Sequence, residues 1–205
     1  MAQQIYATKG NLIQVRKTLA LCQLGYELMD RKRNILIREM LTMIDTARVL
    51  RGSIEQTYRD AYRALQDANM SLGFIQSIAN GVPTDNGLEI TYRSVMGVEL
   101  PKITLSKKPI KIPYGFQSTN SELDEAFISF IKAKETTVLL AEIDNSVFRL
   151  SIAIKKTQMR ANSLKNIMIP RYSELAKLIA DSLEEKEREE FSRLKVIKHK
   201  KQRMR

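Results

Sequence analysis

The sequence is poor in the residues that several large classes of protein depend on. Its 205 residues include no tryptophan, one cysteine, one histidine, 8 glycines and 5 prolines. The single cysteine, Cys22, cannot form an internal disulfide, which fits a reducing compartment. Because glycine, proline and aromatic residues are scarce, the composition favours helices over sheets.

Long apolar runs are also lacking. The most apolar stretches, such as 138–141, are interrupted by charged residues within a few positions, so no segment is typical of a membrane span. The first eleven residues contain no apolar core of signal-peptide length. We therefore expect neither a membrane span nor export.

The motifs of common enzymes are missing. None of the glycines begins a phosphate-binding G-x-x-x-x-G-K-[ST] pattern. One histidine, His199, and one cysteine give a zinc site or a Cys–His nucleophile little to build on. The glutamates of 184–190 alternate with Lys186 and Arg188, as on a solvated helix face. The sequence predicts no catalysis, no metal and no cofactor.

The charge is unusual, with a formal net value of +11. Such a charge permits nucleic acid, an anionic membrane face or an acidic protein as a partner. Much of the excess lies at the C-terminus, which could also be a solvated tail. The basic residues there are Arg193, Lys195, Lys198, Lys200, Lys201, Arg203 and Arg205.

The first segment, 11–80, is predicted to form one long helix. Asn11 and Gln14 resemble a helix start, and Asn80-Gly81 resembles a helix end. Its apolar seam steps by three and four residues, as in helices that wrap around each other. The seam is Leu12, Val15, Leu19, Cys22, Tyr26, Met29, Arg33, Leu36, Met40, Met43, Ala47, Leu50 and Ile54.

The middle segment, 81–120, contains four glycines and four prolines and is predicted to form a short β-hairpin with loops. Asn86-Gly87 is a turn signal, and apolar residues alternate with polar ones from Leu88 to Arg93. A second alternating stretch, Ile110 to Tyr114, lies between prolines, which places any strand there at a sheet edge.

The third segment, 121–198, is predicted to form a second long helix, followed by a basic tail at 199–205. Ser121 to Asp124 resembles a capping box. The helix seam changes phase by one residue at Pro170, which predicts a kink there, or alternatively a break into two helices. The seam is Leu140, Ile143, Val147, Leu150, Ile154, Thr157, Ala161, Leu164, Met168, Tyr172, Leu175 and Ile179.

Length then decides the architecture. A helix of about 68 residues at roughly 1.5 Å each is on the order of 100 Å long. A compact domain of this size has a radius of gyration of only about 17 Å. The fold class expected is therefore mainly α: one elongated antiparallel two-helix coiled coil, with a short β-hairpin and loop knob between the helices and both termini at the far end.

Several stretches resemble the D subunit of V-type (archaeal-type and vacuolar) ATPases. Residues 159–164 followed by Ile169-Pro170 are similar to the family's Arg-x-Asn-Ala-Leu and Ile-Pro run, with Ser163 where alanine is more usual. Residues 184–198 are similar to its acidic-then-basic ending. Residues 12–32 are similar to its opening helix, and 118–124 to the start of its second long helix. The middle segment matches only in kind.

This resemblance implies a non-catalytic rotor shaft that transmits torque between a catalytic ring and an ion-carrying membrane ring. The partners implied are the catalytic A and regulatory B subunits around the paired termini, the small F subunit on the side of the shaft, and a membrane-side coupling subunit at the knob. The chain would then lie at the cytoplasmic face of a membrane, as a peripheral part of the complex. The expected ring contacts are Arg188, Arg193, Lys195 and Lys198.

Two other functions fit parts of the sequence. A basic coiled coil that binds nucleic acid would use the tail and lose affinity steeply as salt rises. However, aromatic residues are not interleaved with the basic ones as a stacking surface requires. A scaffold or membrane-surface helix pair would need a broad apolar face, whereas the flanks of the seam are charged.

Overall fold

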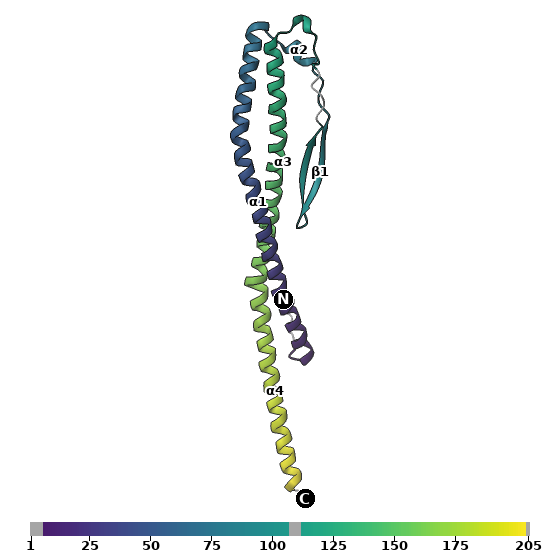
Figure 1. Ribbon diagram of the computed structural model, residues 1–205. Helices are drawn as coiled ribbons and strands as arrows, with labels where there is room; N and C mark the ends of the chain where they lie inside the picture. Colours follow the sequence, from purple (N-terminus) through teal and green to yellow (C-terminus); the bar gives the residue numbers. More distant parts are fainter. Residues whose placement is uncertain (1–5, 107–111, 204–205) are drawn as a thin grey trace. The chain divides into compact units, whose positions relative to one another are not determined.

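A computed structural model of the chain describes residues 6–106 and 112–203. The described chain is mainly helical, and its one hairpin lies between the long helices in sequence, so the predicted fold class is confirmed. The elements, several of which are labelled in Figure 1, are α1 (Lys9–Leu72), α2 (Gln76–Asn80), β1 (Leu88–Val95), β2 (Val98–Leu105), the 3-10 turn η1 (Phe116–Ser118), α3 (Ser121–Ser163), the π-helix η2 (Leu164–Met168) and α4 (Ile169–Arg203).

The chain divides into two compact units, and each contains part of α1. The hairpin unit is Asn34–Ile154, and the terminal unit combines Met1–Arg33 with Lys155–Arg205. None of the described helices is both long and apolar enough to cross a membrane.

In the hairpin unit α1 and α3 pair antiparallel. Arg51 Nη2 lies 3.1 Å from Asp144 Oδ1, and the Tyr58 and Thr137 hydroxyls are 2.8 Å apart. Further along α1, Ser71 donates to the Glu122 carboxylate. Residue numbers therefore rise on α1 while those of their partners fall on α3.

Small side chains line much of this helix interface. Five alanines are buried at or near heptad spacing, so the two backbones can approach closely along this stretch. On the outside, Tyr62 packs edge-on against Phe130 with ring centroids 5.6 Å apart. The buried alanines are Ala47, Ala61 and Ala68 on α1 and Ala126 and Ala133 on α3.

The β-hairpin turns at Met96-Gly97. Both residues have positive φ, 50° and 74°, as a two-residue type I′ turn requires. The strands pair with Val95 opposite Val98 and Leu88 opposite Leu105.

The hairpin is fastened to both helices of its unit, beside α3 (Figure 1). Leu100 of β2 is buried in one cluster with Leu36 of α1 and Leu150 of α3. The Ile103 amide donates to Glu142 Oε2 at 2.8 Å, and Arg149 donates to the Glu99 carbonyl at 3.2 Å. The Ile103 amide and the Glu99 carbonyl lie on the edge of β2 that faces away from β1, so α3 lies along that edge. The nitrogen of Pro101, which has no hydrogen to donate, lies on the same edge.

The structure ends α1 earlier than the sequence suggests. The helix predicted for 11–80 stops at Leu72, because Gly73 adopts φ +74° and its amide still donates to the Asn69 carbonyl. The short helix α2 then follows separately. Gly81, which was predicted to end the long helix, has φ −78° and so does not adopt the left-handed conformation that commonly closes a helix.

The start of α1 also differs by a few residues. Thr8 is the cap, since its Oγ1 accepts from the Asn11 amide at 3.2 Å and its carbonyl accepts from the Leu12 amide. At the other long helix, Ser121 is already helical and the carbonyl of Asn120 accepts from Leu123 and Asp124.

The second strand of the hairpin is not the predicted one. β2 covers Val98–Leu105 and follows β1 after two residues, whereas Ile112 and Tyr114 lie outside any strand. Ile110 lies outside the described residues. Tyr114 instead donates to Asp124 Oδ1 at 2.7 Å and packs edge-on against Phe127, and both contacts attach this segment to the first two turns of α3.

In the terminal unit α1 pairs antiparallel with the end of α3 and with α4. Lys9 forms an ion pair with Glu187 at 2.8 Å, and Arg33 donates to Gln158 Oε1 at 2.9 Å. Val15 and Cys22 of α1 and Ile179 of α4 are buried in this pair.

The helical backbone is uninterrupted from Ser121 to Arg203, so a break into two helices at Pro170 does not occur. The phase change of the seam coincides with the π-helix η2, in which the Ile169 amide donates to the Leu164 carbonyl five residues back. Pro170 is the second residue of α4. A kink at Pro170 stays a prediction.

Candidate partner-binding surface

Within residues 6–106 and 112–203, no segment packs against the last part of α4 along most of its length. We call residues 184–203 the distal α4; every one of them is exposed. The helix α1 begins at Lys9, which pairs with Glu187, and the Lys186 ammonium reaches the Ala7 carbonyl at 3.4 Å. Apart from these two interactions, no hydrogen bond or ion pair joins the distal α4 to another described segment of the chain.

The Lys9–Glu187 pair marks where the two-helix pairing ends. Its hydrogen bond, with the attraction between opposite charges, raises the pKa of the Lys9 ammonium and lowers the pKa of the Glu187 carboxyl. Both side chains are exposed, so solvent screens the pair and its contribution to stability is small.

The four predicted contact residues fall into two classes. Arg188 and Arg193 are engaged within the helix, Arg188 with Glu184 at 2.5 Å and Arg193 with Glu189 at 3.5 Å. Lys195 and Lys198 have no recorded acidic partner among the described residues.

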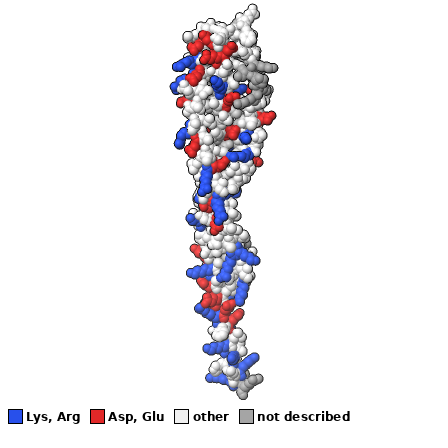
Figure 2. Space-filling model, in the orientation of Figure 1, with Lys and Arg blue, Asp and Glu red and all other residues white. Residues whose placement is uncertain are grey.

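Helix geometry brings only some of these residues together. At 100° per residue, Arg188, Lys195 and Lys198 lie on one side of α4, while Arg193 lies well around the helix from them. Basic side chains dominate this end of the helix in Figure 2.

Two exposed apolar residues on the same side were not among the predicted contacts. Phe191 is 70% exposed and Leu194 is 64% exposed, which is unusual for side chains of this size. They lie at i, i+3 spacing, and Lys195 and Lys198 follow at i+4 and i+7 from Phe191. We call these four residues the distal patch. The i, i+3, i+4, i+7 spacing within the basic ending was the available signal.

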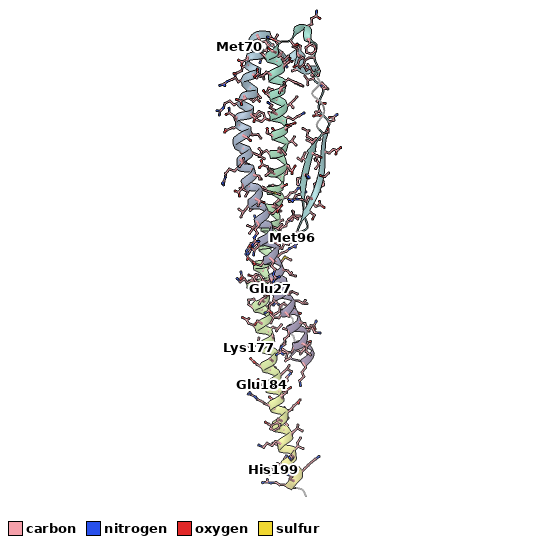
Figure 3. The ribbon with its side chains drawn as sticks, in the orientation of Figure 1. Glu27, Met70, Met96, Lys177, Glu184 and His199 are labelled. Atoms are coloured by element: carbon pink, nitrogen blue, oxygen red, sulfur yellow. The ribbon has the colours of Figure 1, made fainter. Side chains whose placement is uncertain are left out.

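This surface has the composition of a protein contact and lacks that of a reactive site. In the distal patch, two exposed apolar side chains lie next to two lysines that form no ion pair with any described residue. Such a surface fits a partner that offers an apolar surface with acidic neighbours. His199 lies near the end of α4 (Figure 3), and no group of three possible metal ligands occurs in the described parts of the chain.

A second exposed surface lies in the hairpin unit where α1 ends. Phe74 is 99% exposed and Met70, labelled in Figure 3, is 82% exposed. A hollow that Met70 helps to line contains the acidic residues Asp60, Asp67, Glu122 and Glu125, with Arg63 as the basic exception. Figure 2 shows acidic side chains gathered there, so this surface is acidic where the distal α4 is basic.

Comparison with known proteins gives one consistent result. The profile of the family of ATP synthase D subunits matches residues 11–199. The chain is 43% identical over 195 residues to the D subunit of the V-type ATP synthase of Thermotoga neapolitana, covering 94% of this chain and 96% of that protein. It is 35% identical over 200 residues to the D subunit of the A-type ATP synthase of Pyrococcus furiosus, covering 95% and 94%. With the corresponding A-type protein of Methanobrevibacter smithii it shares 32% identity over 207 residues, covering 97% and 90%.

Proposed function

The chain belongs to the family of ATP synthase D subunits, the non-catalytic central-stalk components of rotary ATPases, and we propose that it serves as the shaft that carries torque between a catalytic ring and a membrane ring. Catalysis belongs to other subunits of the same membrane-associated complex. Membership in this family does not favour a nucleic-acid-binding coiled coil.

The observation that supports the shaft most directly is the uncovered distal α4. Twenty consecutive residues of helix are exposed all round, and a helix with no packing partner is expected to find one in its assembly. We propose that the catalytic A and regulatory B subunits surround it, with Arg188, Arg193, Lys195 and Lys198 among its contacts.

The distal patch suggests how torque is transferred. Phe191 and Leu194 supply an apolar contact on one side of the helix, and the lysines beside them attract acidic groups of the ring. Because this surface differs around the helix, the three catalytic interfaces meet different faces of the shaft. Hydrolysis in the ring then turns the shaft, and ion flow turns it in the opposite sense.

The acidic and apolar surface of the hairpin unit fits the other proposed contact. Phe74 and Met70 are suited to docking on a membrane-side coupling subunit, and the small F subunit would bind along the helix pair. In this arrangement the chain lies at the cytoplasmic face of a membrane and is held there by the complex.

The shaft is tested by shortening the chain at Ser192 in the assembled complex. The expected result is continued ATP hydrolysis with a large loss of coupled ion transport, because the ring no longer grips the helix. ATP hydrolysis and ion transport are measured on the same preparation. An unchanged ratio of the two rates would sink the proposed role of the distal α4.

A charge reversal separates the patch from the tail as a whole. Lys195→Glu with Lys198→Glu places acid on the predicted ring-facing side, and coupling is expected to fall. Lys155→Glu with Lys156→Glu is the matched control, since these two lysines are also exposed, on α3. Equal loss of coupling in both variants would contradict a specific contact.

A further inference from the structure

We propose that the shaft contains a built-in flexure at one level of the terminal unit, where both helices of the pair are weakened side by side. The proposal rests on the shaft function above. The flexure consists of Gly25 on α1 and, opposite it, the wide turn, by which we mean η2 (Leu164–Met168) together with Pro170.

On one helix the weakness lies in the backbone hydrogen bonds. The Ile169 amide donates to a carbonyl five residues back, whereas an α-helix uses the carbonyl four back. Pro170 has no N–H, so the next bond is lost altogether. π-helical turns inside α-helices are rare, they are frequently found at functional sites, and they are a recognised cause of bends. The backbone hydrogen bonding of the wide turn is therefore weaker than that of the regular α-helix on either side of it.

On the other helix the weakness is Gly25. Glycine gains the most freedom on unfolding and destabilises a helix interior relative to alanine. A Cβ built on Gly25 meets only Leu164 Cδ1, at 3.7 Å, which is an ordinary van der Waals distance. Alanine fits here, so packing does not require glycine. Its presence leaves α1 weak at the level of the wide turn.

The two weak segments are nevertheless held together. Lys165 Nζ lies 5.7 Å from the centroid of the Tyr26 ring, within reach of a cation–π contact. Ala161 before the wide turn and Ile179 after it are both buried. The helix pair can therefore bend or twist at this level without separating. Such a flexure lets the distal α4 follow an asymmetric partner while the rest of the pair stays closed.

Hydrogen exchange measured by mass spectrometry on the assembled complex tests the flexure. We expect amides of 21–28 and 164–172 to exchange at least tenfold faster than those of 12–19 and 155–161. Gly25→Ala combined with Pro170→Ala should slow the exchange about tenfold at both weak segments, leaving out the amide that the new residue 170 supplies. Gly52→Ala is the control, because it also replaces a glycine of α1 with alanine, and a Cβ at this position has no atom within 4 Å.

Two results overturn the flexure: wild-type exchange equal to that of the neighbouring turns, or equal slowing of the two weak segments by Gly52→Ala. If the double variant does not assemble, Gly25→Ala alone is compared with Gly52→Ala. Uniform exchange would refute the flexure and leave the shaft intact, since the shaft is judged by the coupling of the chain shortened at Ser192. Failure of the shaft proposal would show as an unchanged ratio of ion transport to ATP hydrolysis in the shortened chain, whatever the exchange pattern.

Discussion

The hairpin unit and the distal α4 are stabilised in opposite ways. In the hairpin unit two helices close on small residues, and the β-hairpin adds a third layer that buries Leu100. In the distal α4 nothing is buried, although Phe191 and Leu194 are as large as many core residues. The first region buries its apolar surface within the chain, whereas the second leaves large apolar side chains exposed. The contrast separates residues whose substitution should affect folding stability from exposed residues whose substitution should not.

The largest expected effect is on the core of the hairpin unit. Leu100→Ala should lower the free energy of unfolding by about 2–5 kcal/mol, because it leaves a cavity between Leu36 and Leu150. Thermal or urea unfolding measures the loss. Leu88→Ala, on the exposed strand β1, is the control and should cost well under that amount. Equal losses of unfolding free energy in the two variants would mean that burying Leu100 against the two helices does not stabilise the unit.

Overpacking the small-residue interface should have the next largest effect. Ala61→Leu places a bulky side chain where α1 and α3 approach closely, and should cost about 1–3 kcal/mol. Ala20→Leu is the matched change at an exposed position of α1 and should be close to neutral. Urea midpoints of the two variants decide the point. A neutral Ala61→Leu would show that the interface has spare volume.

A smaller effect should appear only at alkaline pH. Partial burial and the hydrogen bond to Asp124 raise the pKa of Tyr114 above its usual value of about 10. Because the folded-state pKa is raised, the stability that Tyr114 contributes is complete below about pH 10 and declines above it. The melting temperature of the wild type should therefore fall more steeply above pH 10 than that of Tyr114→Phe. Parallel curves would refute the linkage.

The smallest effect on stability is expected in the distal α4. Leu194→Ala should change the unfolding free energy by less than about 0.5 kcal/mol, since the side chain is exposed. In the complex, however, it should reduce coupling. Leu178→Ala is matched in residue type and in exposure, 66% against 64%, and should leave coupling unchanged. A large loss of stability in Leu194→Ala would break the contrast between the two regions.

Much of the helical architecture follows from local pattern. Steps of three and four residues identify the buried seam, and Val15, Cys22, Leu36, Leu150 and Ile179 are indeed buried. The family resemblance, read from residues 12–32, 118–124 and 159–198, is confirmed by the match over residues 11–199. Heptad spacing is a local property, so it is visible without knowledge of the partner helix.

Other features depended on contacts that local pattern does not contain. Gly73 ends α1, although Asn80-Gly81 carries the stronger stop signal. Either glycine can adopt the left-handed conformation, so the local pattern does not decide between them. The strand Val98–Leu105, which includes Pro101, was not predicted from the sequence. It tolerates the proline because the missing N–H of Pro101 would point away from β1, so no hydrogen bond between the strands is lost. The spacing of Phe191 and Leu194 places them on one face of the helix, but the pattern does not show whether another segment covers that face.

The sequence by itself determined the helix-rich class, the antiparallel seam and the basic ending, because these depend on residue type and on spacing along a single helix. Only the tertiary structure decided where α1 ends, which strand completes the hairpin and how the phase change near Pro170 is absorbed. Each of those outcomes is a choice between locally similar alternatives. Contacts between segments distant in sequence supply the free energy that makes the choice.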